Sequence, residues 1–166
     1  MSEDGKMDHV DKILAQWRRE RPDLDVEPMG ILGRLKRLST HLGREVEAVL
    51  MKQGLSSSAF DVLATLRRAG APHRLSPGEL LEMTMVSSGT MTNRIDQLEK
   101  AGYVERILNP EDRRSVLIAL TEKGLATVET AVDAHVVNQH RLSKNLSAAD
   151  KAELDRLLRK FLADFE

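Results

Sequence analysis

The chain has no cysteine among its 166 residues. This absence excludes disulfide bonds, thiolate-bound zinc and sensors that work by cysteine oxidation, and it is typical of a protein in the reducing cytoplasm. Aromatic residues make up only 3% of the chain, which argues against a surface that stacks single-stranded bases. No apolar run is long enough to cross a membrane, and the N-terminus lacks a signal-peptide pattern. We therefore expect a cytoplasmic protein without a membrane partner.

Motifs of metal and enzyme chemistry are also missing. The five histidines include no pair at the spacing of a helical zinc site, and no His-Glu-x-x-His sequence occurs. The chain has neither a phosphate-binding glycine loop nor a nucleophile elbow. We therefore expect no enzymatic activity, no metal and no cofactor.

Charge of neither sign dominates, since the formal net charge is −1. Residues 55–120 carry eight basic and eight acidic side chains. A protein that binds duplex DNA usually has a basic surface, so here any positive face must come from the placement of charges rather than from their number.

Apolar residues at helical spacing predict a mostly α-helical chain. The expected helices cover residues 9–21, 29–53, a segment that begins after Ser57 or Ser58, then 76–83, 87–101, 121–145 and 147–165. Ser76 begins its helix with Pro and Glu at the first and third positions, which predicts a capping box. The helices at 76–83 and 87–101 are separated by a short turn, the arrangement of a helix-turn-helix.

The second helix of this pair has two distinct faces. Met91, Ile95, Leu98 and Ala101 share one face and are expected in a core, and Gly102 ends the helix. Ser87 is the expected N-cap. The opposite face carries small hydroxyl and amide side chains, which suit the edges of base pairs. We expect DNA contacts from this helix through Ser87, Ser88, Thr90, Thr92, Asn93 and Arg94.

A β-hairpin with a basic tip follows this helix. Residues 103–108 and 115–120 have strand composition and flank a polar loop with turn-forming residues. We expect Asp112 and Arg114 to pair and stiffen the loop, so that Arg113, or Arg114, points towards a narrow minor groove. The alternative is an ordinary hairpin whose ion pair is solvated and contributes little. The predicted fold is therefore mostly α with a small β-hairpin wing (α+β), a winged helix-turn-helix.

The motifs Asp112-Arg113-Arg114-Ser115 and Leu120-Thr121-Glu122-Lys123-Gly124, with the upstream Leu98-Glu99-Lys100-Ala101-Gly102-Tyr103-Val104, resemble those of MarR-family transcriptional regulators. The resemblance extends over nearly the whole chain. It implies a disordered N-terminus (1–8), N-terminal helices for dimerisation and a ligand pocket (9–54), a DNA-binding domain (55–120) and C-terminal dimerisation helices (121–166). It implies a homodimer that binds a pseudo-palindromic operator in double-stranded DNA and regulates transcription. We expect it to be a repressor.

The N-terminal segment around Trp17 resembles the urate-responsive branch of this family. That resemblance implies a ligand site formed by Trp17, Asp61, Arg94 and Arg106, and an anionic or aromatic effector such as urate that relieves repression. The alternative is that Trp17 is a core residue and that Asp61 and Arg94 form a structural ion pair.

Two further alternatives remain open at this point. The apolar helices at the two ends of the chain could belong to a larger monomeric core instead of a dimer interface. Winged helices can also mediate protein contacts without touching DNA, and the balanced charge of residues 55–120 is compatible with such a protein-interaction module.

Overall fold

The structure is a computed structural model that describes residues 7–84 and 88–166, with the side chains of residues 88–90 excepted. It contains the helices α1 (His9–Glu20), α2 (Glu27–Lys52), α3 (Ser57–Arg68), α4 (Pro77–Met83), α5 (Ser88–Lys100), α6 (Glu122–Leu142) and α7 (Ala148–Leu162). Three strands, β1 (Arg74–Leu75), β2 (Val104–Leu108) and β3 (Val116–Leu120), form one sheet. The mostly helical fold with a small antiparallel sheet confirms the predicted fold class.

The chain divides into two compact units, residues 1–45 and 46–166. The functional boundaries expected at residues 8, 54 and 120 remain predictions. None of the helices between residues 7 and 84 or between 88 and 166 combines the length and the apolarity that a bilayer crossing requires.

The first unit is built on a small apolar cluster of Val10, Leu14 and Val26. Asp8, which the sequence placed in a disordered N-terminus, is instead the N-cap of α1. Its carboxylate accepts a hydrogen bond from the Asp11 backbone N–H at 2.9 Å. Arg34 of α2 then donates to Asp8 at 2.8 Å and to Asp11 at 2.6 Å, which holds α2 against the start of α1.

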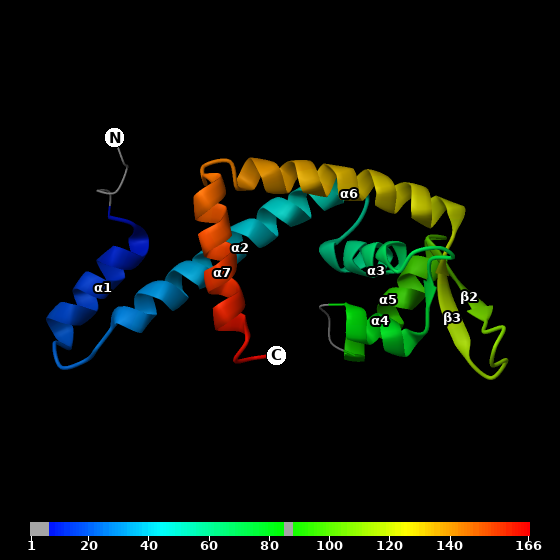
Figure 1. Ribbon diagram of the computed structural model, residues 1–166, viewed down its shortest axis with the longest axis horizontal. Coiled ribbons are helices and arrows are strands. Elements are labelled where there is room, and N and C mark those ends of the chain that lie inside the picture. Colours follow the sequence, from blue (N-terminus) through cyan, green and yellow to red (C-terminus); the bar gives the residue numbers. More distant parts are fainter. Residues whose placement is uncertain (1–6, 85–87) are drawn as a thin grey trace. The chain divides into compact units, whose positions relative to one another are not determined.

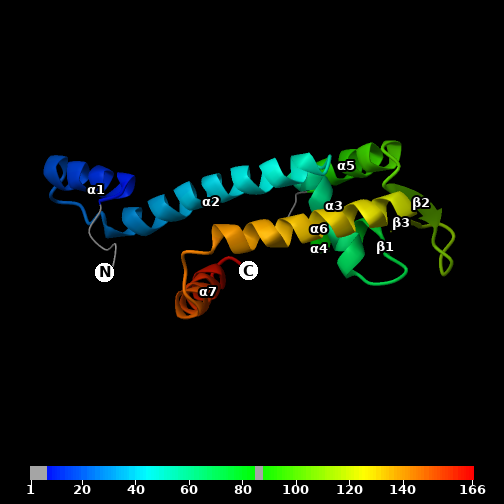
Figure 2. The same cartoon turned by 90° about the horizontal axis from the view of Figure 1, so that it is seen from above.

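The second unit contains the larger core, to which α3, α5, α6 and the sheet all contribute. Its fully buried members include Leu63, Leu66, Leu80, Ile118 and Val128. Figure 1 shows α3, α4 and α5 gathered beside the β2–β3 hairpin. Seen from above, α6 runs along α3 (Figure 2).

Strand β1 was missed by the sequence analysis. It pairs antiparallel with β3, with Arg74 opposite Ala119 and Leu75 opposite Ile118, so that β3 lies between β1 and β2. Two residues are too short to display the alternation by which strands are recognised, so only the pairing with β3 identifies this one.

Helix caps follow the predicted chemistry with one exception. Ser76 with Glu79 and Ser147 with Asp150 form capping boxes, and Thr121 caps α6. For α3 the prediction of Ser57 or Ser58 was wrong, because Ser56 is the cap and its Oγ accepts from Ala59 N at 3.2 Å. Ser57 instead donates its N–H and hydroxyl to the carboxylate of Glu47 on α2. These hydrogen bonds hold the pKa of Glu47 below its usual value.

Candidate nucleic-acid interface

Helix α5 is held by its apolar face and leaves a polar face exposed. Met91, Ile95 and Leu98 are each at most 4% exposed and pack in the core of the second unit. Thr92 and Asn93 lie on the exposed face. The helix therefore presents to solvent a hydroxyl and an amide, side chains that can hydrogen-bond to base edges.

Ser87, the expected cap, lies outside the described residues. Ser88 and Thr90 belong to α5, but their side chains are also outside the described part of the chain.

Asp112 organises the loop of the β2–β3 hairpin through local hydrogen bonds. Its carboxylate accepts from the Arg114 backbone N–H at 3.0 Å, and its carbonyl accepts from Ser115 N and Ser115 Oγ, both at 2.9 Å. The contact between Asp112 and Arg114 is thus a side chain to backbone hydrogen bond rather than the expected ion pair. The bond closes an Asx turn, which stiffens a loop without using the arginine side chain.

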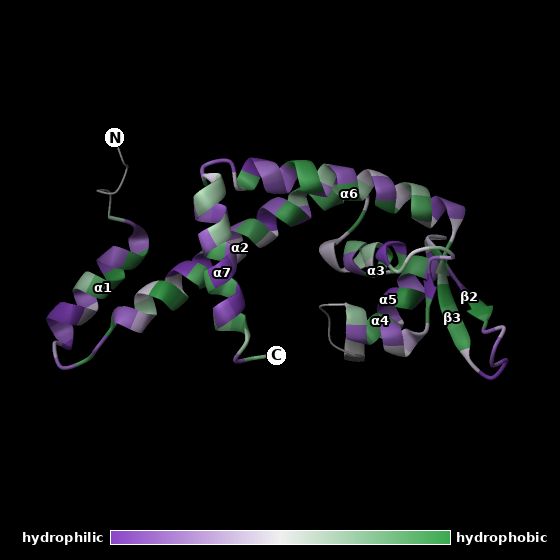
Figure 3. Ribbon diagram, in the orientation of Figure 1, coloured by the Kyte–Doolittle hydropathy of each residue, from purple (hydrophilic) through white to green (hydrophobic). Residues whose placement is uncertain are grey.

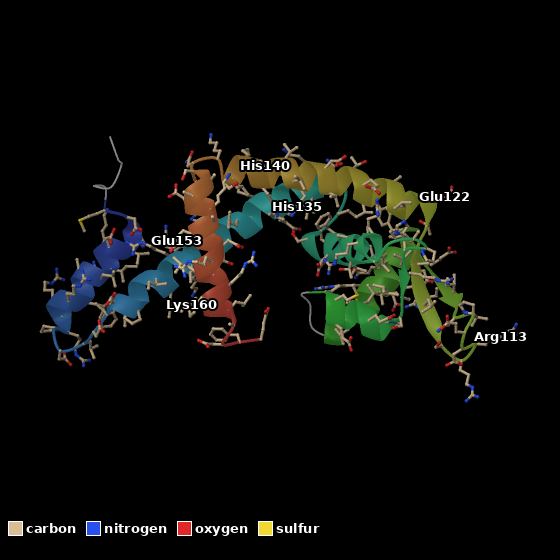
Figure 4. All side chains as sticks on the ribbon, in the orientation of Figure 1. Arg113, Glu122, His135, His140, Glu153 and Lys160 are labelled. Atoms are coloured by element: carbon tan, nitrogen blue, oxygen red, sulfur yellow. The ribbon has the colours of Figure 1, made fainter. Side chains whose placement is uncertain are left out.

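Both loop arginines remain exposed. The side chain of Arg113 points away from the hairpin at its tip (Figure 4). A guanidinium at the tip of a rigid loop can reach towards a negatively charged groove. Because the loop backbone is already ordered, binding costs less conformational entropy.

Arg106 connects the hairpin to α5. Its guanidinium forms ion pairs with Asp96 and Glu99, and its backbone N–H donates to Glu99 Oε1 at 3.3 Å. The side chain of Arg106 retains 33% of its exposure, so each pair is partly screened by water. The sequence analysis assigned Arg106 to a ligand pocket and did not anticipate this contact. Asp96 and Glu99 are three residues apart, so their carboxylates lie on the same face of α5. This spacing in the sequence could have indicated a site for a basic partner.

Arg94 belongs to α5 and lines a small cavity together with residues at the start of α3. The cavity has a volume of about 180 Å³ and is lined by residues that include Ser56, Ser58, Arg94, Gln97 and Tyr103. Among the described residues, Arg94 Nη1 is buried and has no hydrogen-bond partner. This nitrogen therefore makes no hydrogen bond to Asp61, the partner that the sequence suggested.

The other two expected ligand residues lie on different elements. Asp61 is partly buried on α3, and its carbonyl accepts from Thr65 Oγ1 at 2.7 Å. Trp17 lies on α1 in the unit of residues 1–45 and is 42% exposed. Trp17 is therefore not part of the core of the single chain, and its place in a ligand site stays a prediction.

No group of histidine, aspartate or glutamate side chains suited to a metal ion occurs among residues 7–84 and 88–166 with described side chains. The features that remain are a polar helix face, a braced basic loop and a cavity with one buried cationic nitrogen.

Comparison with known proteins identifies the class to which this arrangement belongs. The family model described as "MarR family" matches residues 55–116. The transcriptional regulator PecS of Dickeya dadantii (strain 3937) is 44% identical over 149 residues, which cover 90% of each chain. This relative is named as a regulator of transcription and not as an enzyme.

Solved structures resemble the fold over most of its length. A cysteine-to-serine mutant of MarR from E. coli in complex with operator DNA has a TM-score of 0.70 at 31% identity, and covers 88% of this chain and 97% of that chain. Bordetella bronchiseptica BpsR, whose DNA binding is regulated by 6-hydroxynicotinic acid, has a TM-score of 0.71 at 26% identity, with 83% and 95% covered. The chain therefore belongs to the MarR family of transcriptional regulators.

Proposed function

We propose that the protein is a cytoplasmic homodimer that binds double-stranded DNA sequence-specifically and represses transcription from a pseudo-palindromic operator. The observation that carries this proposal is the exposure of Thr92 and Asn93 on α5 next to a hairpin whose tip presents Arg113. A helix for the major groove and an arginine for the adjacent minor groove together form a complete DNA-reading surface. The structure of MarR with operator DNA supports this assignment.

Dimerisation is supported by apolar side chains that the single chain leaves uncovered. Figure 3 shows apolar positions recurring along α7, and no residue of α7 is buried. Leu154, Leu157, Leu158, Phe161 and Leu162 are each 39–50% exposed. A row of large apolar residues of this kind marks a protein interface, and a second copy of the chain with two-fold symmetry is the simplest occupant.

Regulation by a small anion is supported by the cavity beside Arg94. A buried guanidinium nitrogen without a hydrogen-bond partner is costly, and a bound carboxylate or urate-like oxyanion would satisfy it. The regulation of DNA binding of BpsR by 6-hydroxynicotinic acid, a planar carboxylate, provides a precedent in a protein of similar fold. We infer that Arg94 is the main anion contact. Asp61 and Arg106 remain as proposed contributors, although neither lines the cavity and Arg106 would have to exchange its two carboxylates for the ligand. The role of Trp17 stays a prediction from the sequence.

Binding to DNA from upstream of the protein's own gene, measured over a series of salt concentrations, tests the main proposal. Release of counterions gives a slope of about −0.9 for each phosphate contacted in a plot of log affinity against log salt. We expect a steep slope and a preference for the upstream DNA over a scrambled duplex. Absence of binding, or binding to a protein partner in its place, would favour the protein-interaction module.

The effector proposal is tested by repeating the titration with urate, 6-hydroxynicotinate and the uncharged 6-hydroxynicotinamide. At least one of the anions should weaken operator binding in the wild type, and the amide should not. Ala101→Leu adds volume at the lining of the cavity and should abolish this response while operator binding persists. Ala126→Leu on the exposed surface of α6 is the matched control and should respond as the wild type. If no anion acts on the wild type, the assignment of the cavity is wrong.

A further inference from the structure

The first turn of α6 supplies hydrogen-bond donors to the end of α5. Three consecutive carbonyl oxygens, those of Ala101, Gly102 and Tyr103, accept from this turn. Lys123 Nζ donates to Ala101 O at 2.7 Å, Thr121 Oγ1 to Gly102 O at 2.7 Å, and Thr121 N to Tyr103 O at 3.1 Å. These carbonyls belong to the turn that follows α5, because the last carbonyls of the helix, those of Gln97, Leu98 and Glu99, accept from the backbone N–H groups of residues 101–103. The start of α6 therefore holds the turn that ends α5. We call residues 101–103 and 121–124 the α5–α6 clasp.

The clasp is tight where Gly124 meets Tyr103. A Cβ atom at position 124 would lie 1.9 Å from the Tyr103 carbonyl oxygen, so only glycine permits this approach. Lys123 is the member of the clasp that carries positive charge. Its ammonium group lies 4.7 Å from the centroid of the Tyr103 ring and close to the negative end of the α5 dipole. Lys123 is exposed, so its replacement leaves no buried group without a partner.

Helix α6 is also the element that leads away from the DNA-reading surface. Val128 and Ala131 anchor it in the core beside α3, and further along Val136 and Val137 are 44% and 70% exposed. The chain then continues into the exposed apolar residues of α7. A rotation of α5 against α6 would therefore change the setting of the recognition helix relative to any copy that packs on the far end of α6 or on α7.

We propose that Lys123 is a positioning residue that fixes α5 on α6 and so determines which half-site spacing the dimer accepts. This inference rests on the proposed function as a DNA-binding homodimer. Successive half-sites lie about one helical turn apart, and inserting one base pair rotates one half-site by roughly 34–36° about the DNA axis. A dimer with firmly held recognition helices cannot follow that rotation. Discrimination between spacings therefore measures how firmly α5 is held.

Two substitutions separate this role from a general contribution to folding. Lys123→Met removes the donor and the charge but keeps an aliphatic stem over the Tyr103 ring. Lys123→Arg keeps a cationic donor that also stacks on aromatic rings and should restore wild-type behaviour. Lys144→Met removes an exposed lysine outside the clasp and controls for the loss of one positive charge in DNA binding.

The measurement is binding, at one salt concentration, to the operator, to operators with one base pair inserted or deleted between the half-sites, and to a duplex with a single half-site. The wild type, Lys123→Arg and Lys144→Met should lose at least about tenfold in affinity on either altered spacing, which corresponds to one or more base contacts. Lys123→Met should lose no more than about threefold, because α5 keeps its core packing but loses a contact that sets its angle to α6, so it can adjust to the rotated half-site. Its affinity for the single half-site should stay at the wild-type value.

Two results would overturn the inference while leaving the proposed function intact. One is unchanged discrimination between spacings in Lys123→Met. The other is an equal loss of affinity on the single half-site and on every operator, which would show that Lys123 only supports the fold. If the wild type binds none of the duplexes, the proposed function fails and this inference fails with it.

Discussion

Asn93 and Arg113 are exposed side chains on backbone that is fixed by other residues. Asn93 is carried by a helix whose opposite face is buried, and Arg113 by a loop that Asp112 braces. Such placement leaves the side chain free for a partner while the cost of ordering its backbone has already been met by folding. The two residues therefore allow the DNA proposal to be tested without disturbing the core.

Replacing Arg113 by alanine should weaken operator binding by about tenfold if its guanidinium enters the minor groove, comparable with the loss of one good base contact. Fold and dimer should be unaffected, because Arg113 is exposed and makes no hydrogen bond or ion pair with the residues that the structure describes. Binding at matched salt, with circular dichroism and sedimentation as checks, measures this effect. Unchanged affinity would remove the wing from the DNA-binding surface.

Asn93→Ala should relax sequence preference more than it lowers non-specific binding. A bidentate contact from asparagine to adenine contributes about 1–3 kcal/mol of discrimination. The comparison is affinity for the operator against single-base variants and a scrambled duplex. A uniform loss across all duplexes would indicate that Asn93 contacts phosphate instead of a base.

At the scale of elements, the relative position of α5 and the hairpin depends on Arg106. Its ion pairs with Asp96 and Glu99 join β2 to α5, so the two DNA-reading elements are coupled directly. Arg106→Ala should therefore lower operator affinity even without an effector. Glu105→Ala, at a neighbouring exposed position of β2, is the control. If Arg106→Ala binds the operator with wild-type affinity in the absence of an effector, the ion pairs do not position the β2–β3 hairpin for DNA binding.

The connection between α2 and α3 should be sensitive to acid. Hydrogen bonds from Ser57 lower the pKa of Glu47 in the folded state, so the unfolded state binds its proton more readily. The stabilisation is fully present above about pH 4.3, the ordinary pKa of glutamate, and is lost as the pH falls through the lower folded-state value. Urea unfolding from pH 7 downwards should therefore show a shallower acid loss in Glu47→Gln than in the wild type. Parallel pH profiles would show that this contact adds nothing to stability.

Regular elements were predictable from the sequence where apolar spacing and caps agreed. The α5 helix, its end at Gly102 with φ of +76°, and the caps Ser76, Thr121 and Ser147 all follow from local chemistry. Contacts between distant residues were not predictable in this way. The pairing of β1 with β3, the Glu47–Ser57 contact and the ion pairs of Arg106 all depend on how the chain folds back on itself.

In the candidate site, too, local features were predictable from the sequence and contacts between distant residues were not. Exposure of Thr92, Asn93 and Arg113 follows from which face of a helix or hairpin is polar, so the sequence identified these residues. The cavity beside Arg94 is formed by the loop before α3 together with α5, and one sequence gives no measure of such a volume. Asp112 was identified correctly as a bracing residue, but its hydrogen-bond partner is backbone and not the Arg114 side chain.

At the scale of the whole molecule, assembly is expected to depend on α7. Deleting every residue after Ser147 removes Leu154, Leu157 and Phe161 and the rest of the exposed apolar row. The truncated chain should be monomeric or aggregated in sedimentation experiments, and it should lose operator binding because two half-sites can no longer be engaged together. Full-length Glu153→Gln, a conservative change on the same helix, should remain dimeric. A folded dimer from the truncated chain would place the interface elsewhere.

In the proposed complex, two copies of this chain read two related half-sites of one operator. Hydroxyl-radical footprinting of the gene's upstream region tests it most directly. We expect two protected segments related by approximate two-fold symmetry, with centres about 34–36 Å apart, or a multiple of that distance, along one face of the DNA. A single protected segment without symmetry, or no protection at concentrations where the protein is dimeric, would contradict it.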